Sequence, residues 1–140
     1  MSQISVTTRT LEQTPAGPII EIAFDGYYPP GSAGNEPCAK MIEQARGSIS
    51  DMAPSGVLFN LRHLDYVWGD SIGGLAYLVV RRPQNTTIPA CVVAIGRTAK
   101  ALRFFFSIKG HVFAIAGMRL FENEAEALQF LRTKIEAATV

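Results

Sequence analysis

The segment from Trp68 to Gly74 contains a carboxylate, Asp70, and a hydroxyl, Ser71, among three glycines. It follows an apolar run and precedes a helical pattern, so it is predicted to be a turn at the carboxyl end of a strand. The amino end of a helix favours negative charge, so a phosphate on Ser71 would be stabilised there. That phosphate would add about −1.5 to −2 charge to an otherwise neutral surface. Ser71 is therefore our candidate phosphoacceptor.

Asp70 and Ser71 also have a purely structural interpretation. Both are favoured N-cap residues, and such a cap is worth about 1 kcal/mol to a helix. Gly69, Gly73 and Gly74 could serve only a tight turn or a close approach between helix and sheet. Capping and regulation both stay open at this point.

Trp68 is the only tryptophan of the chain. Exposed in a loop it would suit an interface anchor, whereas half-buried it would plug the end of the sheet. Asp65 would add a charged contact next to it. The candidate partner-binding residues are Asp65, Trp68, Gly69, Asp70, Ser71, Ile72 and Gly73.

Signatures of cofactor and metal chemistry are missing. The sequence contains no GxxxxGKS/T, GxGxxG or HExxH motif. His63 and His111 fall on different predicted elements and have no metal-ligand partner at a recognisable spacing. Cys38 and Cys91 lie in apolar runs, which favours burial over an activated thiolate. We therefore expect no enzyme, no metal and no other cofactor.

Composition and charge point to one globular domain over residues 1–140. The chain is 48% apolar and 18% charged, and its thirteen basic and twelve acidic residues leave a net charge of +1. Such a balance argues against general nucleic-acid binding. Arg97, Lys100, Arg103 and Lys109 gather locally, either as a solvated helix face or as a patch for a partner or a phosphate. No signal-peptide pattern or membrane-spanning stretch is apparent, so we expect a cytoplasmic protein.

Strand and helix patterns alternate after an initial hairpin, which predicts an α/β fold with a mainly parallel five-stranded mixed sheet, an antiparallel N-terminal hairpin and about four helices. The predicted strands are Ile4–Leu11, Ile19–Phe24, Val57–Leu61, Ile88–Ile95 and His111–Ala116. Helices are predicted from Asn35, from Asp70 or Ser71 to Pro83, from Thr98 to Gly110, and from Asn123.

Cap residues and apolar spacing set these helix boundaries. Asn35 and Thr98 are predicted N-caps, and Asn123 with Glu126 resembles a capping box. Three consecutive phenylalanines, 104–106, cannot all face inward on one helix, so at least one is exposed or lines a pocket.

Val57–Val67 followed by Asp70–Leu75 resembles the STAS domain, the fold of bacterial anti-sigma factor antagonists and of sulfate-transporter regulatory tails. The match is to that family's apolar strand, short exit and DSSG-like turn opening a helix. The order of predicted elements fits as well. Family members bind a kinase-like anti-sigma factor or related domains through this turn, and phosphorylation of a serine or threonine there weakens or redirects the binding.

This turn departs from the family pattern and admits two alignments. If Asp70-Ser71 matches the family's Asp-Ser, the acceptor position holds Ile72. If the strand is aligned without a gap, Asp70 falls on the acceptor position and Trp68 replaces the Asp. Asn60 stands where an Asp is common. Ser71 is the nearest hydroxyl in either case.

The resemblance implies a non-enzymatic docking domain whose partner is an anti-sigma factor or a related kinase-like regulatory protein. An exposed strand edge or aromatic patch could also support a homodimer. The alternative hypothesis is a carrier of a small molecule, a lipid or a nucleotide, with a cavity beneath residues 27–30 and 104–106.

Overall fold

The computed structural model describes residues 4–81, 86–109, 113 and 116–138. Its main sheet has five strands in the order β1-β2-β3-β6-β7. β1 and β2 are antiparallel, and the other neighbours are parallel. The predicted mixed sheet with an N-terminal hairpin is therefore confirmed. The strands are β1 (Ser5–Thr14), β2 (Gly17–Tyr27), β3 (Gly56–Asp65), β6 (Ala90–Val93) and β7 (Arg119–Phe121).

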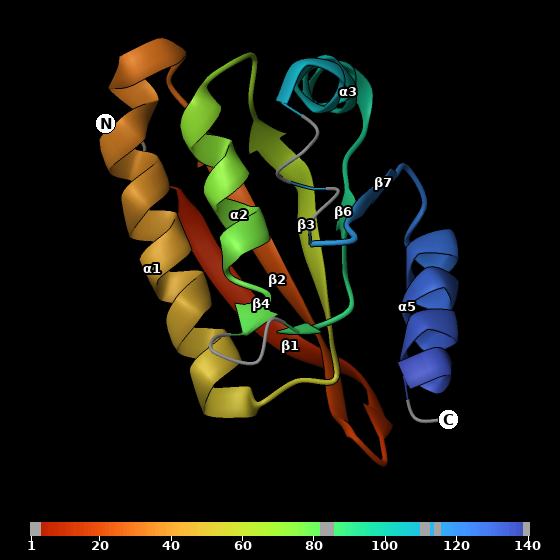
Figure 1. The fold of residues 1–140 in the computed structure, drawn as a ribbon. Helices are drawn as coiled ribbons and strands as arrows, with labels where there is room; N and C mark the ends of the chain where they lie inside the picture. Colours follow the sequence, from red (N-terminus) through yellow and green to blue (C-terminus); the bar gives the residue numbers. More distant parts are fainter. Residues whose placement is uncertain (1–3, 82–85, 110–112, 114–115, 139–140) are drawn as a thin grey trace.

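Helices cover both faces of this sheet (Figure 1). α1 (Asn35–Met52), α2 (Gly74–Tyr77) and α3 (Gly96–Lys109) lie on one face, and α5 (Glu124–Ala138) lies on the other. Two 3-10 turns, η1 (Gly31–Gly34) and η2 (Asp70–Gly73), precede α1 and α2. A two-stranded ribbon pairs β4 (Val80–Arg81) with β5 (Thr86–Thr87). Within the described residues, no helix is both long and apolar enough to cross a bilayer.

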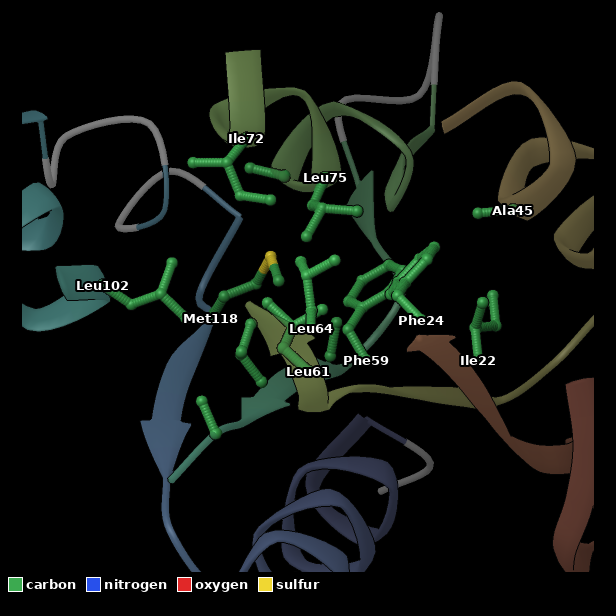
Figure 2. Packing of buried hydrophobic residues seen from close by; sticks show 14 of the residues in the cluster. Ile22, Phe24, Ala45, Phe59, Leu61, Leu64, Ile72, Leu75, Leu102 and Met118 are labelled. Atoms are coloured by element: carbon green, nitrogen blue, oxygen red, sulfur yellow. The ribbon is translucent and has the colours of Figure 1, made fainter. Parts of the chain in front are cut away.

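Alternation along the strands produces two cores. Ile20, Ile22 and Phe24 of β2 face the three-helix side, whereas Ile19 faces α5. Figure 2 shows the larger core, where side chains from β2 and β3 meet Ile72 and Leu75 from the segment after the turn. The turn at the end of β3 is therefore packed against buried apolar side chains.

Two predicted elements differ from the structure. The predicted strand His111–Ala116 lies largely outside the described residues, and of its two described members Phe113 is helical and Ala116 is in a turn. Phe113 stacks on Phe106, with ring centroids 4.1 Å apart, and β6 pairs with Arg119–Phe121 instead. The fifth strand is thus later and shorter than predicted.

The second difference concerns the helix after the turn. It is predicted to continue to Pro83, but α2 ends at Tyr77 and Val80 already pairs with Thr87 in the β4–β5 ribbon. The apolar stripe is real, since Leu75 and Val79 are buried, yet only part of it is helical. Pro83 itself lies outside the described residues.

The last helix begins as expected. Asn123 Oδ1 accepts a hydrogen bond from the backbone N–H of Glu126 at 3.1 Å, which confirms the asparagine arm of the predicted capping box. Ala127, Leu131 and Ile135 are buried against the sheet.

A buried carboxylate joins β1, β2 and β3 beside the start of α5. Glu21 accepts a hydrogen bond from Arg9 Nε at 2.8 Å and another from Asn60 Nδ2 at 3.4 Å. Arg62 approaches Glu21 and Glu124 at 4.0 and 3.8 Å. Burial opposes ionisation of Glu21, but the hydrogen bond and charge of Arg9 outweigh it and lower the pKa.

Glu21→Gln should lower the free energy of unfolding at pH 7 by about 1–2 kcal/mol, because a charged hydrogen-bond network loses its centre. Since the folded-state pKa of Glu21 lies below its ordinary value, its carboxylate stabilises the fold at any pH above that ordinary value. The contribution is lost as the pH falls through the lowered folded-state value. Urea unfolding between pH 7 and pH 3 should therefore show a steeper acid loss for the wild type than for Glu21→Gln.

Glu12→Gln is the matched control. Glu12 also pairs with an arginine, Arg132, at 2.6 Å, but this pair is far more exposed to solvent. Its removal should change the unfolding midpoint little. Equal losses for the two variants would contradict a special role for the buried carboxylate.

Candidate functional site

The turn after β3 is held in place by backbone hydrogen bonds to the end of β2. Tyr28 N–H donates to the carbonyl of Asp65 at 2.9 Å, and Gly31 N–H donates to the carbonyl of Trp68 at 3.4 Å. The Tyr66 hydroxyl donates to the carbonyl of Gly69 at 2.9 Å. Residues 66–69 therefore have a fixed path even though they are not in a helix or a strand.

Thr98 fastens the same turn from the other side. Its hydroxyl donates to the carbonyl of Leu64 at 2.6 Å and accepts from the backbone N–H of Tyr66 at 3.2 Å. The predicted role of Thr98 as an N-cap is wrong, because α3 begins at Gly96 and Thr98 lies inside it. Its buried hydroxyl instead satisfies two backbone groups of the β3 exit.

Tyr28 determines how tightly the turn can fold. Its side chain is fully buried and packs edge-on against Tyr66, with ring centroids 5.0 Å apart. Gly69 has a φ of 148°, and a Cβ at this position would lie 2.9 Å from the Tyr28 ring. A Cβ at Gly34 would meet both the Pro29 carbonyl and the Tyr28 ring. Glycine is needed at both positions.

Ser71 is tied to the first residue of α1. Its hydroxyl donates to Asn35 Oδ1 at 2.5 Å. The predicted cap at Asn35 is wrong, because the N-cap of α1 is Gly34 and no side chain caps it. Neither Asp70 nor Ser71 caps η2 or α2, so the capping interpretation of these two residues does not hold either. The two predicted caps bind each other instead.

The predicted partner-binding residues divide into exposed and buried ones. Trp68 is 59% exposed, with its ring packed on Gly31, and so is an exposed aromatic side chain rather than a plug. Asp70 is exposed, and Asp65 binds Arg97 at 2.6 Å at the surface. Gly69, Ile72 and Gly73 are buried, so they support the turn from inside the protein, and Ser71 is half-buried.

Three exposed apolar residues near the turn were not among the predicted set. Tyr27 pairs in register with Asp65, Val67 precedes Trp68, and Tyr77 on α2 is 62% exposed. A signal was available for Tyr27, because the buried Tyr28 must face the opposite side of an extended chain from its neighbour. We define the aromatic surface as Trp68 together with these three exposed residues, Tyr27, Val67 and Tyr77, which belong to the turn or to the elements on either side of it.

Ser71 also stands at the centre of a GxSxG pattern, Gly69–Gly73. In α/β-hydrolases this pattern places a nucleophilic serine next to a histidine. Here the hydrogen-bond partner of Ser71 is the Asn35 side chain, and no histidine of the described residues contacts it. Among the described residues, no hydrogen bond joins the Ser71 hydroxyl to a base that would activate it as a nucleophile.

The buried cysteine and tyrosine side chains stay uncharged at neutral pH. Burial raises the pKa of the Cys91 thiol to about 12 and also raises the pKa of Cys38. The pKa values of Tyr28 and Tyr66 are likewise raised by burial. None of these four groups is prepared to act as a nucleophile at neutral pH. Within the described part of the chain, no three His, Cys, Asp or Glu side chains gather as metal ligands would.

Two surface hollows lie far from the turn, at the end of the sheet where β2 and β3 begin. One, of about 210 Å³, is lined by Ser55 and Thr86–Pro89, and the other, of about 460 Å³, lies between Glu12–Ala16 and α5. Neither lies beneath residues 27–30 or 104–106, where the carrier hypothesis places its cavity.

The crystal structure of an anti-sigma factor antagonist from Mycobacterium paratuberculosis has a similar architecture, with a TM-score of 0.61. The alignment covers 91% of this chain and 95% of that chain at 20% sequence identity. The fold is STAS-like. This confirms the fold that the resemblance in the sequence predicts. No family model matches the chain, and no curated protein matches it by sequence.

Gly34→Ala should destabilise this STAS-like fold by about 1–3 kcal/mol, because the added methyl group meets the Pro29 carbonyl and the Tyr28 ring, which lies 2.5 Å from the ideal Cβ. Gly47→Ala is the matched control. Gly47 lies in the middle of α1 with nothing within 4 Å of the added Cβ, so the substitution should stabilise by about 0.5–1 kcal/mol. Thermal unfolding measures both. A neutral Gly34→Ala would contradict the close packing around Tyr28.

Proposed function

We propose that this chain is a docking domain that acts as an anti-sigma factor antagonist, binding an anti-sigma factor or a related kinase-like regulatory protein without catalysing a reaction. The observation that carries the proposal is Trp68, 59% exposed in the turn of a fold that is also found in an anti-sigma factor antagonist. Exposed tryptophans on fixed backbone are favoured interface anchors. We place this activity in the bacterial cytoplasm.

The aromatic surface gives the docking site its proposed extent. Tyr27, Val67 and Trp68 follow directly from the paired ends of β2 and β3, and the polar groups of Asp70 and Ser71 lie beside them. Apolar residues with a polar margin are the usual composition of a protein interface. Large exposed apolar side chains that gather around one turn also mark an interaction surface.

Phosphorylation of Ser71 is the proposed control of docking. A phosphate on Oγ removes the hydrogen bond that Ser71 donates to Asn35, so α1 and η2 lose this link. The added charge also stands next to Asp70 and near Glu36, the residue after Asn35, and like charges repel. The proposed effect therefore arises from the added charge, because Ser71→Ala removes the same hydrogen bond without adding charge. η2 and α2 have only four residues each, so a helix dipole contributes little.

The test is a pull-down from host lysate with the tagged full chain, analysed by mass spectrometry. Wild type and Ser71→Ala should recover an anti-sigma factor or kinase-like regulator, whereas Ser71→Asp should not. Trp68→Ala should reduce recovery at least about tenfold, as loss of an anchor residue does. Lys134→Ala, on the exposed side of α5, is the control and should leave recovery unchanged. Circular dichroism checks that every variant is folded.

Each alternative outcome has a consequence. Equal recovery by Ser71→Ala and Ser71→Asp would remove the phosphorylation switch and leave the docking site. Recovery that is insensitive to Trp68→Ala would place the docking site elsewhere on the domain. A chain that recovers no regulatory protein, but retains a small molecule in native mass spectrometry, would support the carrier hypothesis instead.

A further inference from the structure

α3 exposes two large apolar side chains that the core does not use. Phe104 is 68% exposed and Ile108 is 58% exposed, and the two are four residues apart on one helix face. Their neighbours Phe105 and Phe106 turn inward and pack against Phe113. Phe104 and Ile108 therefore form an apolar stripe on the outer face of α3.

The same helix face is basic. α3 contains no acidic residue, and Arg97 and Lys100 precede Phe104 at spacings that continue its stripe. Arg97 pairs with Asp65, and Arg103 pairs with Glu122 on the flank of the helix. Lys100 forms no ion pair with any residue that the structure describes. We define the α3 surface as Arg97, Lys100, Phe104 and Ile108.

This surface is continuous with the proposed docking site. The ion pair between Arg97 and Asp65 joins the first turn of α3 to the end of β3, and Thr98 binds the backbone of the same strand exit. Ile95, just before α3, is exposed as well. A partner seated on Trp68 would therefore have α3 within its reach.

We propose that the α3 surface binds an acidic amphipathic helix of the docking partner. Apolar side chains at helical spacing contact Phe104 and Ile108, and flanking carboxylates face Arg97 and Lys100. The inference rests on the proposed function, since it names the chemistry of the partner's contacting element.

The test uses defined peptides with the isotope-labelled full chain. An acidic probe is a synthetic helical peptide with leucines spaced three and four residues apart and glutamates on either side of them. A basic probe replaces every glutamate with lysine. The acidic probe should shift the amide NMR signals of α3, including those of Lys100, Phe104 and Ile108, in a saturable way, and the basic probe should not.

Substitutions on α3 make the test specific. Phe104→Ser should raise the Kd of the acidic probe at least about tenfold, as expected for an exposed aromatic anchor. Lys100→Glu should weaken binding of the acidic probe several-fold and produce measurable binding of the basic probe. Lys134→Glu makes the same charge change on α5, across the sheet, and should leave both probes as in the wild type. All three positions are exposed, so the variants should fold.

Several results would overturn the inference. These are equal binding of the two probes, shifts confined to residues outside α3, or no binding of either probe. Binding of phosphatidylcholine–phosphatidylglycerol vesicles that depends on Phe104, without peptide binding, would assign the surface to lipid instead. The proposed function is judged separately by the pull-down. A regulator lost with Trp68→Ala but retained with Phe104→Ser leaves that function standing and removes only the α3 contact.

Discussion

The parallel pairing of β2 with β3 fixes the position of nearly every other part of the molecule. It runs from Ile19–Gly56 to Tyr27–Asp65, along almost the full length of both strands. Because side chains alternate along each strand, this register decides which apolar residues face the three helices and which face α5. It also brings the two strand ends together, so that Tyr28 can lie beneath the turn that follows β3. A one-residue shift of β2 relative to β3 would expose the core side chains and also separate Tyr28 from the turn.

The layers of the fold could be predicted from the sequence because they depend on patterns that repeat. The first half of β1 follows period-two alternation, β3 is a mostly apolar run, and the buried residues of α1 and α5 follow helical spacing. Short segments, which hold too few residues to show a repeating pattern, were not predicted correctly. The apolar run from His111 gave no sign that its phenylalanine belongs to an aromatic cluster with α3, whereas Arg119–Phe121 is too short and too mixed to be recognised as a strand.

The turn that carries the candidate site was predicted in place, but its contacts were not. Its position follows from the end of a strand, which local sequence reveals. Its contacts join residues far apart in the chain, and no local rule predicts them. Asn35 and Ser71 were each assigned to a helix end because their side chains commonly cap helices, yet they bind each other. Thr98 was assigned to its own helix for the same reason, and it holds the exit of β3 instead.

The fully buried ring of Tyr28 has a consequence for kinetics. Since Gly34 and Gly69 fit around that ring and Tyr66 packs against it, residues 65–69 are ordered before any partner arrives. A protein that docks there need not wait for a loop to fold, so its association rate depends on diffusion and orientation, typically about 10⁵–10⁷ M⁻¹s⁻¹. Differences between partners then lie in how slowly they leave. With such a preformed turn, the surrounding side chains would affect the lifetime of a complex more than the rate at which it forms.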